Sequence, residues 1–205
     1  AELLAAYRKI TPTDSFTDDS GVYAKYIAPP HIFAGEKRNS KLTFREDFAM
    51  NETRTGVGVD THAFGGDKNY IVLGGVRIPA ASGLVAHSDG DVLCHAVMDA
   101  LLSAAGLSDI GHYFPDTDPQ YKGANSLILL ENVRKLIENE GFCAENVSAA
   151  IVAQAPKLAP HIRQMKQNLA HALQISERAV GITAGTNEGL GYLGRGEGIT
   201  VIASV

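Results

Sequence analysis

The sequence of 205 residues lacks tryptophan, has only two cysteines and contains no long apolar run. No segment approaches the roughly 18 consecutive apolar residues of a membrane-spanning helix, and no charged-then-apolar signal segment opens the chain. Cys94 and Cys143 are too few for a disulfide framework and too far apart in sequence for a metal-binding pair. We therefore expect a protein of a reducing compartment such as the cytoplasm, with no membrane partner.

Basic residues are also in short supply, since 18 Lys and Arg stand against 23 Asp and Glu and leave a formal net charge of -5. They are scattered rather than massed in runs, so the chain lacks the electrostatic footprint of a protein that binds nucleic acid. Glycine is abundant, with 21 residues, and hydrophobic residues make up 45%. This composition is typical of a globular α/β or α+β protein and argues against general disorder.

The composition changes near residue 50, where a polar, charged stretch gives way to a segment rich in Gly, Ala and Val. The first part holds one short helical candidate, residues 2–10, followed by a turn-rich segment at residues 11–15. About fifty residues of this kind can hardly bury a core alone. We expect them to be the end of a larger domain, or an arm packed on something else.

Beyond residue 53, apolar alternation and turn residues predict strands and helices that alternate along the chain. Strands are expected at residues 55–62, 70–73, 147–153, 181–184 and 199–203. Helices are expected after the capping residues 88–91 up to residue 105, and at residues 125–140 and 160–173. This order favours an α/β (α+β) fold with a mixed four-stranded sheet and helices packed on one face.

Asp60, His62 and His95 form a candidate metal site. Asp60 and His62 are two residues apart on a predicted strand, so their side chains lie on the same side of it. His95, one turn into the following helix, would complete a set of one carboxylate and two imidazoles, which suits zinc. Three protein ligands leave a fourth position open, as in catalytic zinc sites. The spacing alone is a weak signal, and solvated polar residues are the alternative interpretation.

Asp91, His95 and Asp99 are four residues apart and stack on one face of the predicted helix. A carboxylate beside a ligating imidazole commonly fixes its tautomer. The alternative is a helix whose early acidic residues favour the macrodipole and whose polar stripe faces water.

Three further segments are rich in residues that bind anions or hydroxyls. Residues 109–118 carry three carboxylates between two helices, and residues 185–191 and 194–198 are glycine-rich. Lys157 follows a strand and a proline turn. Each pattern suits contact with a substrate or phosphate. Solvated turns are the alternative interpretation, and for the glycine-rich segments they are the commoner one.

From residue 54 to its end the chain closely resembles the 2-C-methyl-D-erythritol 2,4-cyclodiphosphate synthase family of the non-mevalonate isoprenoid pathway. The resemblance rests on the separated motifs DTHAF at 60–64, AHSDGD at 86–91, DIG at 109–111, FPDTD at 114–118, AQAPK at 153–157 and GRGEG at 194–198. The first fifty residues resemble the tail of the cytidylyltransferase of the same pathway in FTDD at 16–19 and NSKLT at 39–43. The resemblance implies two parts, a cytidylyltransferase remnant with linker at residues 1–52 and a synthase domain at residues 53–205, as in a bifunctional fusion.

The resemblance also implies roles for individual residues. Zinc, or manganese or cobalt, is expected on Asp60, His62 and His95, and magnesium on Glu188. The methylerythritol phosphate portion of the substrate is expected to contact His87, Ser88, Asp109, Ile110, Gly111 and Asp116. The cytidine diphosphate pocket is expected to involve Ala153, Pro156, Lys157, Leu158, Ala184, Thr186 and Glu188. Tyr192, Arg195 and Glu197 resemble the lining of a central cavity in a homotrimer whose active sites are shared between neighbours.

The reaction implied by the resemblance is an intramolecular phosphoryl transfer that closes a cyclodiphosphate and releases CMP, with Thr186 and Glu188 among the catalytic residues. The chain departs from the family pattern at Gly185 and Asn187, where threonines are more frequent, and at Tyr192, where phenylalanine is usual. Two other functions stay open, a zinc phosphohydrolase and a non-catalytic trimeric scaffold that binds a ligand. Thr17 and Lys41 match substrate-contacting positions of the transferase, but its glycine-rich, basic CTP-binding segment is absent, so we expect no transferase activity.

Overall fold

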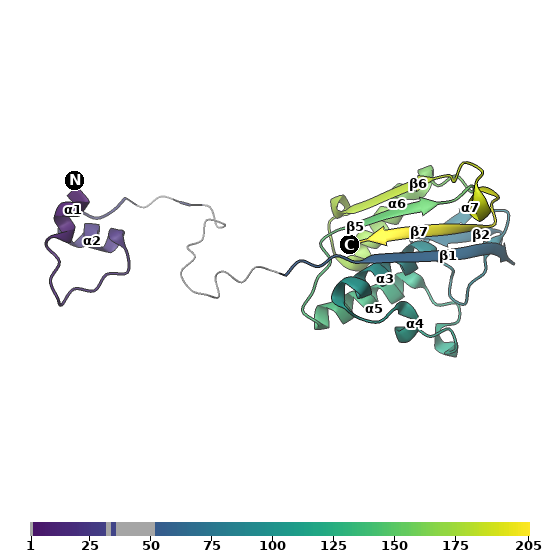
Figure 1. Ribbon diagram of the computed structural model, residues 1–205, viewed down its shortest axis with the longest axis horizontal. Helices are drawn as coiled ribbons and strands as arrows, with labels where there is room; N and C mark the ends of the chain where they lie inside the picture. Colours follow the sequence, from purple (N-terminus) through teal and green to yellow (C-terminus); the bar gives the residue numbers. More distant parts are fainter. Residues whose placement is uncertain (1, 32–33, 36–51) are drawn as a thin grey trace. The chain divides into compact units, whose positions relative to one another are not determined.

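The computed structural model describes residues 2–31, 34–35 and 52–205 (Figure 1). The contacts within the chain divide it into two compact units, residues 1–51 and 52–205, and each unit is described by itself. The NSKLT motif at 39–43, including Lys41, lies outside the described residues.

The first unit contains two short helices, α1 (Glu2–Tyr7) and α2 (Asp19–Tyr26). The sequence analysis predicted the first helix and missed the second, which begins after an N-cap whose carboxylate accepts the Gly21 N–H. Asp14, in the turn between the two helices, accepts hydrogen bonds from Lys25 and from the Tyr26 hydroxyl. A carboxylate eleven residues upstream therefore anchors the end of α2, a contact that local sequence patterns do not reveal.

The second unit is built on a mixed sheet with the strand order β4-β1-β7-β5-β6. Only β5 and β6 are parallel, and the other neighbours are antiparallel. The strands are β1 (Val57–Gly66), β4 (Gly83–Leu84), β5 (Val147–Val152), β6 (Val180–Gly185) and β7 (Gly198–Ser204). The predicted α/β (α+β) fold with a mixed sheet is confirmed, and the two-residue β4 adds a short fifth strand at the edge.

The predicted strand at residues 70–73 forms, but outside this sheet. As β2 (Tyr70–Leu73) it pairs with β3 (Val76–Pro79) in a separate antiparallel hairpin. Gly74 and Gly75 make the turn, both with positive φ, as a two-residue hairpin turn requires.

Three long helices accompany the sheet: α3 (Val92–Ala105), α5 (Ser126–Asn139) and α6 (Ile162–Leu173). Their ends follow the predicted caps, since Asp91 caps the N-terminus of α3 and Gly106 ends it in a left-handed conformation. Shorter turns of helix are α4 (Ile110–Tyr113), α7 (Gly191–Gly194) and three 3-10 segments at 119–121, 159–161 and 177–179. Among the described helices, none is both long and apolar enough to cross a membrane.

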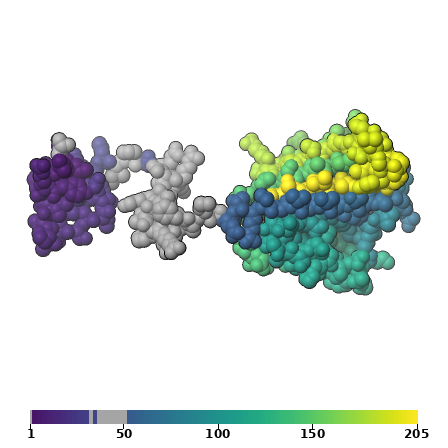
Figure 2. Space-filling view, viewed as in Figure 1, coloured from purple at the N-terminus to yellow at the C-terminus, as the bar shows by residue number. Residues whose placement is uncertain are grey.

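One face of the sheet is buried and the other is exposed. Ile199, Val201 and Ala203 of β7 are fully buried, whereas Ile202 between them is 47% exposed. Figure 1 shows α3 and α5 together on one side of β1 and β7, and Figure 2 shows residues of these two strands as adjacent bands at the surface.

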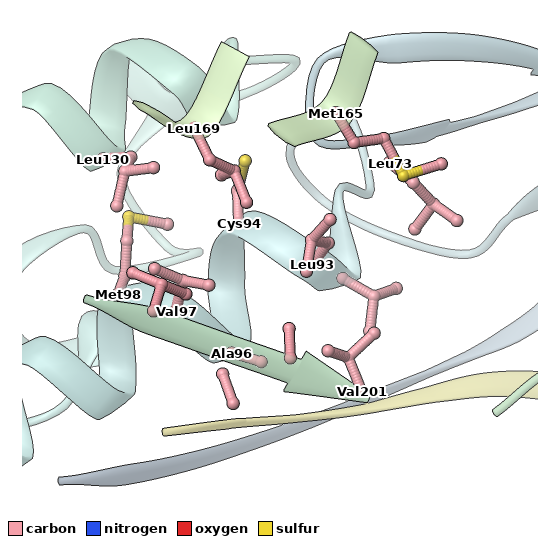
Figure 3. Packing of buried hydrophobic residues seen from close by; sticks show 14 of the residues in the cluster. Leu73, Leu93, Cys94, Ala96, Val97, Met98, Leu130, Met165, Leu169 and Val201 are labelled. Carbon is pink, nitrogen blue, oxygen red and sulfur yellow. The ribbon is translucent and has the colours of Figure 1, made fainter. Parts of the chain in front are cut away.

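The core lies between the sheet and α3. Figure 3 shows Leu93, Val97 and Met98 of α3 among side chains of α5, α6 and β7. Cys94 is also fully buried there, whereas Cys143 is exposed. Because ten residues of α3 are buried, this helix is the central element of the unit, and its position is set by packing on every side.

Candidate metal centre

Asp60 and His62 of β1 meet His95 of α3 on the buried face of the sheet. The register with β7 pairs Asp60 with Val201 and His62 with Ile199, so both side chains point to the side that the helices cover. Nδ1 of His95 lies 3.0 Å from Oδ2 of Asp60, and Nδ1 of His62 lies 3.1 Å from the same oxygen. The potential ligand atoms of the three residues all lie within 4.8 Å of one another. The structure thus brings together the three residues that the sequence analysis selected.

The chemistry of this group fits a divalent cation. Nδ1 of His62 is buried and, although it lies 3.1 Å from Oδ2 of Asp60, it has no partner with hydrogen-bond geometry among the described residues. Leaving a buried polar atom unsatisfied costs about 1–3 kcal/mol, and a cation bound between the two imidazoles and the carboxylate would remove that cost. Asp60 and His62 keep 20% and 15% of their side-chain surface exposed, so an incoming ligand has access to the group.

The electrostatics keep Asp60 ionised. Burial by itself raises the pKa of the Asp60 carboxyl, but the two adjacent imidazoles outweigh burial and hold this pKa well below its usual range. Burial lowers the pKa of His95, but the Asp60 carboxylate, with smaller contributions from Asp91 and Asp89, outweighs burial, so the pKa of His95 is raised. An ionised carboxylate beside two imidazoles offers the charge and the oxygen and nitrogen donors that suit a divalent cation.

Asp91 caps the N-terminus of α3, as the helix-terminus interpretation expected, but neither Asp91 nor Asp99 bonds to the imidazole or belongs to a stripe that faces water. Asp91 is fully buried and accepts backbone N–H groups from Cys94, Gly74 and Gly75 at 3.0, 2.9 and 2.7 Å. Asp99 accepts the backbone N–H of Ile110 at 2.9 Å. Spacing by four residues aligned these side chains with His95, but each carboxylate is directed to a backbone donor at a helix N-terminus or in a turn, and neither bonds to the imidazole.

The partners of His95 that sequence reasoning missed come from other segments. Nε2 of His95 lies 3.1 Å from Oγ of Ser126, the first residue of α5, and 3.2 Å from Oγ of Ser88. Ser126 in turn donates to Asp89 at 2.5 Å. The sequence analysis treated Asp89 only as a capping residue and did not select Ser126, which lies 31 residues from His95 and carries no local signal.

The residues expected to contact the methylerythritol portion come from the loop before α3 and from α4 with the segment after it. His87 is exposed and Ser88 is half-buried in the loop before α3. Asp109 caps α4 by accepting the His112 N–H at 3.0 Å, and the bond from Ile110 to Asp99 ties α4 to α3. Gly111 and Asp116 are exposed in the same region of sequence.

The residues expected to contact the nucleotide gather elsewhere in the unit. Residues 153–158 follow β5, and Ala184, Thr186 and Glu188 lie at or after the end of β6. Because β5 and β6 are parallel, both segments leave the same edge of the sheet, and Ala153 donates to the Gly185 carbonyl at 3.0 Å. β5 is two strands and β6 is three strands from β1, which correspond to about 10 and about 14 Å. Within one chain, therefore, the nucleotide segments and the metal centre lie apart.

Two of the residues that depart from the family pattern, Asn187 and Tyr192, make hydrogen bonds within the chain. The Asn187 amide donates to the Leu190 carbonyl at 2.8 Å and closes the turn. The Tyr192 hydroxyl lies 3.0 Å from Oγ1 of Thr200, so the extra hydroxyl is paired within the chain. Arg195 donates to Glu197 through two nitrogens, at 2.6 and 3.3 Å, and both side chains are exposed.

Comparison with known families matches residues 53–205 to the YgbB family. The chain belongs to the YgbB family. Its match to 2-C-methyl-D-erythritol 2,4-cyclodiphosphate synthase of Pseudomonas entomophila is 57% identical over 150 residues and covers 73% of this chain and 95% of that protein. The YgbB-family region therefore includes the metal centre and both groups of expected substrate-binding residues.

Solved structures extend the comparison to the first unit of this YgbB-family chain. The bifunctional IspDF of Campylobacter jejuni matches with 40% identity and a TM-score of 0.72, over 99% of this chain and 56% of that chain. This chain thus spans little more than half of that bifunctional protein. IspF of Plasmodium falciparum, solved as a CDP complex, matches with 32% identity and a TM-score of 0.66, over 76% of this chain and 96% of that chain.

Proposed function

We propose that the chain is a 2-C-methyl-D-erythritol 2,4-cyclodiphosphate synthase. It would convert 4-diphosphocytidyl-2-C-methyl-D-erythritol 2-phosphate to the 2,4-cyclodiphosphate and release CMP. The observation that carries the proposal is the convergence of potential ligand atoms of Asp60, His62 and His95 within 4.8 Å, in a region 57% identical to a protein of that name.

The reaction needs little proton transfer. An oxygen of the 2-phosphate bonds to the β-phosphorus, the bond from that phosphorus to the bridging oxygen breaks, and CMP leaves with the electron pair. A phosphate monoester with a second pKa near roughly 6 is largely ionised at neutral pH, so no general base is required. The protein must instead bring two mutually repelling phosphates into line and neutralise their charge.

The residues of this chain supply binding and orientation. When bound, zinc on Asp60, His62 and His95 and magnesium on Glu188 would supply Lewis-acid neutralisation of phosphate oxygens. His87, Ser88 and the N-terminus of α4 would hold the methylerythritol hydroxyls and phosphate. Thr186, which donates to Glu188 at 2.6 Å, would keep that carboxylate oriented toward the diphosphate.

We also propose that the active site is completed by a second copy of the chain, in a homotrimer. The separation of about 14 Å between β1 and β6 supports this, because a single chain then leaves the two halves of the site apart. Val57, Val59 and Ile202 are 60%, 57% and 47% exposed on the helix-free face of the sheet, and an apolar face of this kind suits burial against another copy.

Residues 1–52 we assign to the end of a cytidylyltransferase domain with its linker, and residues 53–205 to the synthase domain. The match to a bifunctional protein over 99% of the chain supports this division. Leu4 and Tyr7 of α1 are 61% and 43% exposed, which suits a fragment that packs on a further part of a transferase domain.

The test is incubation of the full chain with the diphosphocytidyl substrate, followed by phosphorus NMR and a CMP assay. A synthase gives the cyclic diphosphate with one CMP per turnover, and a chelator stops the reaction. A zinc phosphohydrolase would give linear phosphates, and a non-catalytic scaffold would bind without turnover. Elemental analysis of the purified protein identifies the metal. His62→Ala should abolish CMP release, and His171→Ala on α6 is the control that should retain it.

A further inference from the structure

Ser126 is a fully buried hydroxyl between a ligand of the metal centre and a carboxylate. It is the first residue of α5 and is 0% exposed. Its Oγ lies 3.1 Å from Nε2 of His95 and 2.5 Å from Oδ1 of Asp89. A buried hydroxyl with two polar neighbours has defined donor and acceptor roles.

The roles follow from Asp89, whose ionised carboxylate only accepts hydrogen bonds. Its Oδ2 accepts the Ser126 N–H at 3.0 Å, and its Oδ1 accepts both the Ser126 hydroxyl and, at 3.2 Å, the Asp91 N–H. The single hydroxyl hydrogen of Ser126 is therefore directed to Asp89. Only the lone pairs of Oγ remain for His95, so Nε2 of that imidazole must be the donor.

This assignment fixes the other nitrogen of His95. Nδ1 lies 3.0 Å from Oδ2 of Asp60 and donates a hydrogen bond to that carboxylate while no cation is bound. A cation between the two residues would replace this hydrogen, and because Nε2 keeps its own hydrogen, the neutral imidazole would then offer its lone pair on Nδ1. We propose that Ser126 and Asp89 are positioning residues that select the Nε2–H tautomer of His95 and hold Nδ1 as its metal-binding atom. The inference rests on the proposed metal centre and adds two residues to it.

Ser88 does not share this role, although its Oγ lies 3.2 Å from the same nitrogen. Ser88 accepts the Gly90 N–H at 3.2 Å and is only half-buried. Among the described residues no carboxylate takes its hydroxyl hydrogen, which leaves that hydrogen free to bond to a phosphate or hydroxyl of a substrate. Ser126 therefore orients the imidazole, and Ser88 keeps a hydroxyl available for the substrate.

The test measures binding of Co²⁺ and Zn²⁺ to the metal-free full chain by competition with a chelator. Ser126→Ala should weaken binding about 10- to 100-fold, as loss of an outer partner of a ligating histidine typically does. Ser103→Ala, which removes an exposed hydroxyl from α3, should bind as the wild type does. Asp89→Asn keeps the side-chain shape but loses one acceptor, and it should weaken binding in the same direction, which provides a second variant if Ser126→Ala does not fold.

Nitrogen-15 NMR of labelled histidines gives a readout that does not depend on any variant. In the wild type loaded with Zn²⁺, we expect His95 to carry its hydrogen on Nε2 and to show the metal shift on Nδ1. Zinc on Nε2 of His95, or affinity of a folded Ser126→Ala within about twofold of the wild type, would overturn the role of Ser126. Failure of the wild type to bind either ion would remove the metal centre itself, and the role with it.

Discussion

Gly58 of β1 lies directly against Ala96 of α3, because a Cβ on Gly58 would stand 2.1 Å from the Ala96 carbonyl oxygen. Gly56, two residues earlier, faces the Ala100 carbonyl oxygen in the same way. Strand and helix therefore touch through their main chains. Since Asp60 follows Gly58 by two residues and His95 precedes Ala96, this contact also sets the spacing of the metal ligands.

We predict that Gly58→Ala pushes α3 away from β1. The added methyl group would overlap backbone atoms of α3, so the free energy of unfolding should fall by about 1–3 kcal/mol or more. Urea unfolding of the metal-free protein measures the change. Gly181→Ala is the matched control, because the nearest atom to its added Cβ would be 3.7 Å away, and it should leave stability nearly unchanged. Equal stability of both variants would contradict a main-chain contact between β1 and α3.

We predict that His62→Phe separates stability from metal binding. The substitution keeps a ring of similar size but removes an imidazole that helps to hold the pKa of Asp60 low, so the metal-free protein should lose at most about 1 kcal/mol in free energy of unfolding at neutral pH. Metal binding and CMP release should be lost. Denaturant unfolding in the presence of a chelator and a metal-binding assay check the two effects. A variant that is strongly destabilised without metal would show that His62 serves the fold.

Asp91 should give the protein a recognisable pH dependence. Burial raises the pKa of its carboxyl above the usual 3.8, against the pull of backbone N–H groups from Cys94, Gly75 and Gly74. Between the unfolded pKa and the raised folded pKa, the folded chain binds more protons than the unfolded chain does. The contribution of Asp91 to stability is therefore largest below pH 3.8 and is lost as pH rises through the folded pKa, with a slope of at most about 1.4 kcal/mol per pH unit.

The variant Asp91→Asn isolates this effect, because asparagine also caps helices and does not titrate. The difference in free energy of unfolding, wild type minus variant, should decrease as pH rises above 3.8. Chemical denaturation of the metal-free proteins over a pH series measures it. A difference that stays constant or increases with pH would mean that the three N–H groups dominate and that the carboxylate is stabilised.

Val59→Glu should dissociate the proposed homotrimer into folded single chains. Val59 is 57% exposed on the helix-free face, and a charge there would have to be desolvated in an interface. Sedimentation and circular dichroism measure mass and folding. Ile128→Glu, at a residue 55% exposed on α5, is the control and should assemble like the wild type. A Val59→Glu protein with unchanged mass would place the interface elsewhere.

Local signals in the sequence were sufficient for most elements of the second unit. Asp91 and Gly106 delimit α3 because capping acts within one or two residues of the helix end. The same local reasoning missed α2, where Gly21 weakens the helical pattern and distant contacts of Asp14 compensate. Local reasoning also did not predict that β2 would pair with β3 outside the main sheet, because strand pairing is decided by packing rather than by periodicity.

The candidate site was predictable only where the strand geometry fixed it. Asp60 and His62 share a face because side chains alternate along a strand, and the register with β7 then directs both to α3. The partners of His95 were not predictable in this way. Ser126 reaches the imidazole because α5 packs on α3, a tertiary contact that leaves no spacing in the sequence.

The contrast between the two cysteines has a practical consequence. The thiolate is the form that reacts with alkylating reagents, and burial raises the pKa of the Cys94 thiol well above its usual value. Iodoacetamide should therefore label exposed Cys143 first and reach Cys94 only when α3 separates from its neighbours. Because His95 is the next residue, the labelling rate of Cys94 would report how often the helix that carries this candidate ligand separates from its neighbours.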